Sequence, residues 1–297
     1  MFKINKKEKT LYLNRLSSIE NIYKFPIRLI LHKLSRRHIK KNSQLVVFSF
    51  DHIAHAINLD GLYEKNNLEL LIYWINSNCP SFLNGNVLDI GANIGNHSLF
   101  FSNYFKKVIS FEPHPKIFKI LSLNTENIKN IKIYNFGASN KNTSLSMLEN
   151  KLNMGGSKLS LNNTTTSLNV KLKKLDDFCK DLKNITLLKI DTEGHEKEVL
   201  EGAKKIIVKH RPLIIFEQQA ADFKQGSSST IDRLKILNYN SFGVLQEGPF
   251  YYRKLPKFIR FIIFNFFGIF FNQYVRIKIV SNIEADFYPF IIALPDE

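Results

Sequence analysis

The sequence is poor in cysteine, proline and glycine, and each shortage excludes a class of protein. Its two cysteines, Cys79 and Cys179, are 100 residues apart, so neither a disulfide framework nor a thiolate metal site is expected. With 9 prolines, 13 glycines and 44% hydrophobic residues in 297, the chain is neither fibrous nor disordered. The basic N-terminus is not followed by the apolar core of a secretory signal. We therefore expect a cytoplasmic globular protein with reduced thiols.

Acidic residues are also scarce. Only 26 Asp and Glu stand against 42 Lys and Arg, which gives a net charge of +16. Residues 1–41 hold 12 of the basic residues against Glu8 and Glu20, so this arm alone carries +10. A basic arm suits an anionic partner such as nucleic acid, a membrane surface or an acidic glycan. The whole chain is rich in Lys, Asn, Ile and Phe, however, and a general compositional bias explains part of the excess equally well.

No apolar run reaches the length of about 20 residues that a membrane-spanning helix needs. Residues 25–34 have the pattern of a short basic amphipathic helix, and residues 250–271 contain eight phenylalanines with basic residues on both sides. Aromatic residues with basic flanks fit a helix lying in the membrane interface. A lid or subunit contact that buries the same phenylalanines is the alternative. Peripheral contact with the inner face of a membrane, through residues 1–41 and 250–278, is therefore one of two interpretations.

Downstream of residue 85, apolar segments of strand length alternate with segments of helical length. Strands are expected at 86–90, 107–111, 131–136, 185–190, 212–217, 240–246 and 287–293, with hairpin strands near 143–148 and 168–173. Helices are expected at 63–75, 115–126, 195–209 and 229–237, and a strand-like stretch at 45–50. This alternation is typical of an α/β fold whose parallel sheet is covered on both faces.

The most informative segment is residues 87–98, where an apolar run ends in Asp89 and two glycines open a helix. Such a turn brings backbone N–H groups and the positive helix start close to a ligand. Glu112 ends the next apolar run, 21 residues after Gly91. In nucleoside-binding folds, a carboxylate at this position accepts hydrogen bonds from the ribose hydroxyls. Asn93 stands where a dinucleotide turn needs its middle glycine. We therefore expect a nucleoside cofactor without phosphates, of which S-adenosylmethionine is the common one; an ordinary strand-turn-helix is the alternative.

Three sequence blocks together resemble the FkbM-type S-adenosylmethionine-dependent methyltransferases, over about residues 60–220. The blocks are Asp89 to Gly95, Phe111-Glu112-Pro113-His114-Pro115 with Asn124 beyond it, and Leu188 to Glu196 continuing to Glu217. The resemblance implies a Rossmann-like class I methyltransferase sheet, mostly parallel, with seven strands of which the last is antiparallel. The implied organisation is a basic N-terminal extension (1–45), a methyltransferase domain (46–249), an aromatic and basic insertion (250–284) and the final strand of the domain (285–297).

The same resemblance assigns residues to the cofactor. These residues are Asp89, Gly91, Asn93, Gly95, Glu112 and Ala138. The glycine turn would lie under the methionine end of S-adenosylmethionine, and Asp89 would hold that turn or reach the amino-acid moiety. Glu112 would accept hydrogen bonds from both ribose hydroxyls, and residues 135–138 would lie near the adenine.

Carboxylates and an imidazole gather at the carboxyl end of the expected strand 185–190, the edge where open α/β sheets bind ligands. The catalytic candidates are Asp191, Glu193, His195 and, after the next strand, Glu217. An alcohol has a pKa near that of water, about 15.7, so methylation of its oxygen needs a base within hydrogen-bond reach. His195 has a suitable pKa, and the carboxylates could orient it or serve as the base themselves.

Simpler roles compete for several of these residues. Acids at a helix start also merely stabilise its dipole, and Glu196 with its neighbours is expected to form a solvated face. A divalent metal held by Asp191 and Glu217 has no ligand spacing to support it, so no metal is expected. His52 and His55 could line the cleft, although a structural role is favoured.

The leading hypothesis is an O-methyltransferase that uses S-adenosylmethionine and acts on a hydroxyl of a sugar in a surface glycan or glycolipid. An RNA methyltransferase is a second hypothesis, which the net charge favours. It is weakened because Asp191-Thr192-Glu193-Gly194 stands where amino-methylating nucleic-acid enzymes carry an Asn/Asp-Pro-Pro-aromatic motif. A cofactor-fold binding module without catalysis, acting at a membrane, is the third hypothesis. The sequence specifies no oligomeric state.

Overall fold

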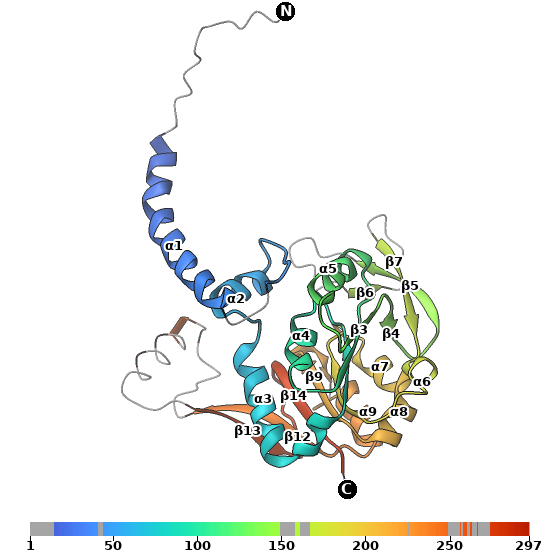
Figure 1. Cartoon of the computed structure of the whole chain (residues 1–297). Helices are drawn as coiled ribbons and strands as arrows, with labels where there is room; N and C mark the ends of the chain where they lie inside the picture. The colour runs from blue at the N-terminus through green and yellow to red at the C-terminus, as the bar shows by residue number, and fades with distance from the viewer. Residues whose placement is uncertain are drawn as a thin grey trace, which may run out of the picture.

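A central eight-stranded sheet organises the computed structural model, which describes residues 15–40, 44–148, 158–160, 167–224, 226–248 and 274–296, with 256, 258–259, 262 and 266 (Figure 1). The strand order is β13-β12-β14-β9-β8-β1-β2-β3. The strands are β1 (Asn86–Ile90), β2 (Lys107–Phe111), β3 (Ile131–Tyr134), β8 (Ile185–Ile190), β9 (Leu213–Gln218), β12 (Ser241–Gly248), β13 (Tyr274–Val280) and β14 (Tyr288–Leu294).

Strands β3, β2, β1, β8 and β9 pair in parallel, whereas β14 is antiparallel to both of its neighbours, β9 and β12. The predicted α/β class, with a mostly parallel sheet and an antiparallel last strand, is confirmed. The prediction had seven strands, and these seven are present. An eighth, β13, adds an antiparallel edge next to β12, and it comes from the segment expected to be an insertion.

Two hydrophobic clusters, one on each face of the sheet, hold the layers together. In β9 the side chains alternate strictly between them, since Leu213 and Ile215 belong to one cluster and Ile214 and Phe216 to the other. Helices α3 (Lys65–Asn78) and α4 (Asn96–Ser102) pack on the first face. Helices α6 (Leu175–Phe178), α7 (Glu196–Gly202), α8 (Lys204–His210) and α9 (Ser229–Ile236) pack on the second. Period-two burial of this kind fixes the register of each strand.

The remaining elements extend this core. Helix α5 (Pro115–Thr125) follows β2, and a smaller four-stranded sheet has the order β4-β7-β5-β6. Its strands are β4 (Gly137–Ala138), β5 (Thr143–Leu148), β6 (Lys158–Ser160) and β7 (Ser167–Lys173). The expected hairpin is confirmed, because β5 and β7 pair antiparallel. Short pieces complete the described chain: η1 (Pro80–Asn84), η3 (Ala220–Asp222), β10 (Phe223–Lys224) and β11 (Ser227–Ser228).

Two local predictions are wrong. Residues 44–48 form neither helix nor strand, because the backbone N–H and C=O of Val46 bond to the side chain of Asn124, at 2.7 and 3.0 Å, instead of a strand. The expected helix 195–209 is divided into α7 and α8 at Ala203. Gly202, the last residue of α7, packs so closely on Ser139 that a Cβ there would lie 1.9 Å from the Ser139 carbonyl oxygen. This contact holds the chain in place at the junction of the two helices.

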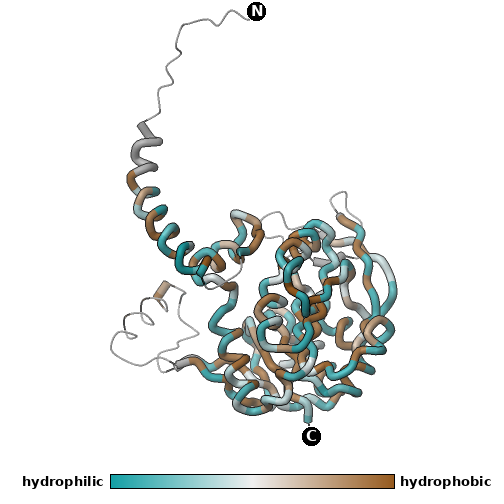
Figure 2. Tube along the Cα trace, viewed as in Figure 1, coloured by the Kyte–Doolittle hydropathy of each residue, from teal (hydrophilic) through white to brown (hydrophobic). Residues whose placement is uncertain are grey.

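Helix α1 (Arg15–Ile39) extends away from the body and packs on α2 (His52–Asp60) (Figure 1). Apolar and polar positions alternate along it, as Figure 2 shows. Residues 1–14 of the basic arm and most of the Phe-rich stretch lie outside the described residues. Among the residues that are described, no helix combines the length and the apolar character needed to cross a bilayer.

Candidate active site

The glycine turn after β1 has a backbone that few residues adopt. Gly91, Asn93 and Gly95 have φ values of 76, 50 and 93°, in the left-handed region that glycine enters freely and asparagine tolerates. A Cβ on Gly91 would lie 1.8 Å from the carbonyl oxygen of Asp191. Only glycine therefore lets the ends of β1 and β8 approach at this point.

The N–H groups of this turn are already used within the protein. Those of Gly91 and Ala92 donate to the Phe111 carbonyl, both at 3.0 Å, and that of Asn93 donates to the Glu112 carboxylate at 3.0 Å. A phosphate cradle would instead present such groups to its ligand. The turn thus shapes a surface for a ligand rather than supplying anion donors, as expected for a cofactor without phosphates.

Asp89 lies beneath the turn, fully buried, and does not line the cavity described below. It accepts a hydrogen bond from Ser98 Oγ at 2.5 Å, and its Oδ1 lies 3.4 Å from Lys189 Nζ. Lys189 also donates to the Gly91 carbonyl at 2.9 Å. Of the two expected roles for Asp89, the geometry fits the one in which it holds the turn, through Lys189, and not a direct contact with a ligand.

Lys189 is the most important residue that the sequence reasoning missed. Its ammonium group is buried and also lies 3.2 Å from the Asp191 carboxylate. Burial alone would lower its pKa, but the carboxylates of Asp191 and Asp89 raise it above its usual value. A signal was available, because a lysine in the apolar strand Ile185–Ile190 cannot be buried without carboxylate partners.

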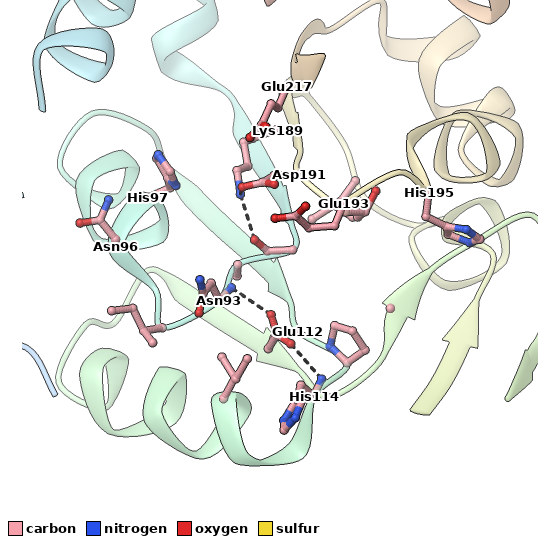
Figure 3. Close-up of a pocket in the computed structure, with 18 of the residues that line it drawn as sticks. Asn93, Asn96, His97, Glu112, His114, Lys189, Asp191, Glu193, His195 and Glu217 are labelled. Atoms are coloured by element: carbon pink, nitrogen blue, oxygen red, sulfur yellow. Dashed lines mark hydrogen bonds and ion pairs between the residues drawn. The ribbon is translucent and has the colours of Figure 1, made fainter. Parts of the chain in front are cut away.

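Glu112 lies at the end of β2 and is 6% exposed. One carboxylate oxygen accepts from Asn93 N at 3.0 Å and the other from His114 N at 2.8 Å, as Figure 3 shows. Burial raises its pKa to about 7, although these two hydrogen bonds and Lys189 oppose the rise. Asn135 fixes the backbone below it by donating to the Glu112 carbonyl at 2.8 Å.

The third sequence block brings its carboxylates together at the same edge of the sheet. Asp191, Glu193 and Glu217 line one cavity, and Lys189 lies beside Asp191 (Figure 3). Burial raises the pKa of Glu217 to about 8, and the negative charges of Asp191 and Glu193 add to the rise. Gln219 Nε2 donates to the Glu217 carboxylate. The Glu217 carboxyl therefore gains or loses its proton close to neutral pH.

His195 lines the same cavity, but Figure 3 shows its ring pointing away from the carboxylates. Its Nε2 lies 2.9 Å from Ser139 Oγ and its Nδ1 3.5 Å from the Glu198 carboxylate. Burial lowers its pKa, while Glu198 opposes the change. Both ring nitrogens thus have partners away from the acid cluster.

The expectation of a solvated face at Glu196 is wrong. Glu196 is 8% exposed, and its Oε1 accepts hydrogen bonds from Thr192 N, Thr192 Oγ1 and Gly194 N at 3.1, 3.1 and 3.0 Å. Burial raises its pKa above the usual value, against the effect of these bonds. Glu196 therefore shapes the loop that carries Asp191 and Glu193, with Glu193 itself at a φ of 55°.

These groups surround one cavity of about 530 Å³, within the size range of small-molecule sites. Its lining includes Gly91, Asn93, Glu112, Ala138, Asp191, Glu193, His195 and Glu217 of the predicted residues, whereas Gly95 and Asp89 lie outside it. His52 lines it and His55 does not. Besides Lys189, the lining residues that sequence reasoning missed include Ile53, Tyr63, Asn96, His97, Gln219 and Phe287.

The resemblance places the adenine near residues 135–138, and two of these residues line the cavity. Gly137 and Ala138 line the cavity together with apolar side chains of Ile117, Met147 and Leu172. Within the described residues, no group of three or more His, Cys, Asp or Glu side chains is placed to hold a metal ion.

The sheet order, the glycine turn and a buried carboxylate at the end of β2 define a class I methyltransferase fold. The profile of the FkbM methyltransferase domain matches residues 89–244, more than half of the chain. The protein therefore belongs to the FkbM methyltransferase family, as the sequence blocks indicated. The matched domain is a methyltransferase domain, and S-adenosylmethionine is the cofactor expected for it.

Individual relatives are more distant. The chain is 28% identical to Methyltransferase 1 of Beauveria bassiana over 142 residues, 39% of this chain and 57% of that protein. A crystal structure of methyltransferase FkbM from Methylobacillus flagellatus KT is 16% identical, with a TM-score of 0.34, covering 67% of this chain and 49% of that one. An rRNA methylase from Streptococcus thermophilus is 12% identical, with a TM-score of 0.36, covering 73% and 94%. The chain thus spans only about half the length of the first two relatives.

Proposed function

We propose that this protein transfers the methyl group of S-adenosylmethionine to a hydroxyl group, that of a sugar in a surface glycan or glycolipid. One observation carries the proposal. A single cavity has a buried ribose-type anchor, Glu112, at one end and a cluster of carboxylates around Glu217 at the other (Figure 3). Donor and acceptor would therefore meet inside one cavity.

The residues present fit S-adenosylmethionine. A carboxylate has about four acceptor positions, and the N–H groups of Asn93 and His114 occupy two of those on Glu112. Two remain, one for each ribose hydroxyl. Gly91 and Asn93 of the turn line the cavity, and the wall of Gly137, Ala138 and Leu172 suits an adenine ring.

S-adenosylmethionine supplies a methyl group on a positively charged sulfur. The role left to the protein is to place the acceptor oxygen in line and to accept its proton as the new bond forms. We assign the proton to Glu217, because its pKa of about 8 is close to a working pH. With the cofactor bound, the acceptor oxygen would take the methyl group as the carbon–sulfur bond breaks, and Glu217 would accept the proton that the hydroxyl loses. The positively charged sulfur of bound S-adenosylmethionine would favour the ionised form of Glu217 before the reaction.

Asp191 and His195 have supporting roles in this proposal. The Asp191 carboxylate is paired with the Lys189 ammonium at 3.2 Å, so this ion pair already engages it. His195 is engaged by Ser139 and Glu198. Glu193 shares the carboxylate cluster and contributes to the raised pKa of Glu217.

The charge of the cavity supports a neutral, hydroxyl-rich acceptor over a nucleic acid. Asp191, Glu193 and Glu217 stand against the single ammonium of Lys189 among its lining residues. Phosphodiesters entering next to these carboxylates would be repelled. Sugar hydroxyls can instead donate hydrogen bonds to them.

Replacement of Glu217 tests this mechanism. In a methyl-transfer assay on extracted cell-envelope glycans, we expect Glu217→Gln to reduce kcat about 100-fold, within the usual range for a general base. Cofactor affinity should change less than threefold. Glu69→Gln is the matched control, because the Glu69 side chain is 56% exposed on α3 and does not line the cavity. Wild-type turnover by Glu217→Gln, with His195→Ala inactive, would move the role of base to His195.

We also propose peripheral contact with an anionic membrane, where lipid-linked glycans would be met at the cytoplasmic face. Support comes from α1, whose Ile22, Phe25, Leu29 and Ile30 are 56 to 74% exposed. Residues 15–40 hold seven Lys or Arg and one Glu. Exposed apolar side chains among cations suit an interface. In the Phe-rich segment, Phe258 and Phe266 are also exposed.

Co-sedimentation with vesicles tests this contact. The full chain should bind vesicles containing phosphatidylserine and not neutral vesicles, and added salt should weaken the binding. Replacement of Phe25 and Leu29 by Ser should abolish it. Absence of binding to anionic vesicles would end the membrane proposal and would leave the proposed methyl transfer unaffected.

A further inference from the structure

The wall of the cavity facing the sheet edge comes from a segment outside the matched family domain. His52, Ile53 and Tyr63 line the cavity, while the family profile matches only residues 89–244. Tyr63 belongs to the connection between α2 and α3. Residues upstream of the common domain are therefore placed to distinguish this protein's acceptor from those of other family members.

Asn96 holds Tyr63 in place by its backbone. The side chain of Asn96, at the start of α4, accepts from Tyr63 N at 3.0 Å and donates to the Tyr63 carbonyl at 3.0 Å. The next residue, His97, lies 3.1 Å from the Glu64 carboxylate through its Nε2. Asn96 and His97 lie side by side, directly after the glycine turn (Figure 3). The wall is thus attached to the helix that the cofactor turn opens.

The Tyr63 ring is also held from the sides. It packs edge-on against the rings of His52 and His97, with centroid distances of 5.6 and 6.3 Å. A ring fixed by two neighbours and by both of its backbone polar groups loses little freedom when it meets a ligand, which is what a positioning group requires.

Tyr63 also lines a second, smaller cavity together with Lys189, Asp191 and Glu217, which places it beside the carboxylates at the acceptor end. Burial raises the pKa of its phenol, and so do the carboxylates of Glu64, Asp191 and Glu217. The phenol therefore stays protonated and acts as a hydrogen-bond donor, not as a base. These carboxylates would repel the carboxylate of the cofactor's methionine moiety, whereas an acceptor hydroxyl can lie between the phenol and Glu217.

We infer that Tyr63 positions the acceptor for methyl transfer by donating a hydrogen bond to an acceptor oxygen, and that Asn96 acts through Tyr63 by fixing its backbone. The inference rests on the proposed methyl transfer. Its signature is a higher acceptor KM without weaker cofactor binding, which a residue of general structural importance would not produce.

The experiment measures two quantities on the same purified full-length variants. The first is the affinity for S-adenosylhomocysteine by calorimetry, and the second is the transfer of labelled methyl from S-adenosylmethionine to a cell-envelope glycan extract at graded extract concentrations. The variants are Tyr63→Phe, Asn96→Leu and their combination. The matched controls are Tyr73→Phe, on a side chain 71% exposed on α3, and Asn103→Leu at the other end of α4.

We expect Tyr63→Phe to raise the half-saturating extract concentration about tenfold, the effect of one lost hydrogen bond. Its maximal rate and its affinity for S-adenosylhomocysteine should stay within twofold of wild type, and both controls should match wild type. Asn96→Leu should show the same rise, and the combined variant should be no worse than Asn96→Leu alone, because both act on one contact.

Four results would overturn the inference. Tyr63→Phe could leave the half-saturating concentration unchanged while wild type is active, or it could weaken S-adenosylhomocysteine binding to the same extent, which would make Tyr63 a cofactor residue. Additive effects of the two replacements would separate Asn96 from Tyr63. A wild-type chain that transfers no methyl to the extract would refute the proposed function itself, and the inference with it.

Discussion

Replacement of Glu112 by Gln tests the cofactor end of the site with a single change of one atom. The glutamate uses both of its oxygens to accept N–H groups, from Asn93 at 3.0 Å and His114 at 2.8 Å. An amide has one acceptor oxygen, so its NH₂ must face one of these N–H donors. The Glu112→Gln variant therefore has fewer acceptor positions for the ribose hydroxyls, and its one acceptor oxygen cannot serve both of them.

The magnitude follows from the number of bonds lost. Hydrogen bonds to charged groups contribute about 1.5–3 kcal/mol each, and each 1.4 kcal/mol is about a tenfold change in affinity. Loss of one such bond to ribose should weaken S-adenosylmethionine binding about 10- to 150-fold. Calorimetry at pH 8 measures this with Glu112 mainly ionised, because its pKa is about 7.

A pH series strengthens the test. A carboxyl with a pKa of about 7 is mostly protonated at pH 6, so wild-type affinity should fall about tenfold between pH 8 and pH 6. Glu112→Gln should lack this dependence, and Glu69→Gln, on a residue 56% exposed on α3, should behave as wild type. Wild-type affinity in Glu112→Gln at pH 8 would refute the assignment of ribose to Glu112.

Three further predictions concern the groups around the cavity. Lys189→Met leaves the carboxylates of Asp89 and Asp191 without their cation, so urea denaturation should show a loss of about 3–5 kcal/mol; a loss below about 1 kcal/mol would contradict the pairing. Gly91→Ala puts a Cβ 1.8 Å from a carbonyl oxygen and should abolish cofactor binding by calorimetry, whereas Gly226→Ala, at a φ of 87° with open space around it, should not. Because the folded-state pKa of Glu217 is raised to about 8, its contribution to stability is present in acid and lost as the pH rises through 8. The Tm of the cofactor-free protein should then fall between pH 6 and 9, and by less in Glu217→Gln; an equal fall would contradict the raised pKa.

The strands and the glycine turn could be predicted because their signals are local. β1, β2 and β8 begin and end where the apolar runs do, at Asn86–Ile90, Lys107–Phe111 and Ile185–Ile190. Glycine at position 91 follows from a positive φ that the turn needs whatever packs around it. The residues of the turn and the apolar runs thus predicted the class of fold and the cofactor end of the candidate site.

The remaining half depends on contacts between distant residues. Asn96 meets Tyr63 across 33 residues of chain, and Lys189 meets Gly91 across 98. An asparagine at a helix start has the same local pattern whether it caps its own helix or holds another segment. Sequence spacing therefore could not reveal the wall that carries Tyr63.

Glu196 and β13 illustrate two other limits. Glu196 has the local pattern of an exposed helix-start acid, but Gly194 at a φ of 99° turns the loop back onto its carboxylate. Strand β13 lies in a segment that is dominated by phenylalanines. It forms by pairing with β12, a contact that local sequence does not reveal. Both outcomes were decided by tertiary packing, which overrides local preference.

In the proposed mechanism, one cavity brings S-adenosylmethionine together with a hydroxyl acceptor beside Glu217. The most direct measurement uses S-adenosylmethionine with a ¹³C-labelled methyl group and the cell-envelope glycan extract, followed by NMR of the product. We expect a new methyl ether carbon, formed in equal amount with S-adenosylhomocysteine, and formed about 100-fold more slowly with Glu217→Gln. A label found on nitrogen or carbon, or an equal yield from Glu217→Gln, would contradict the account.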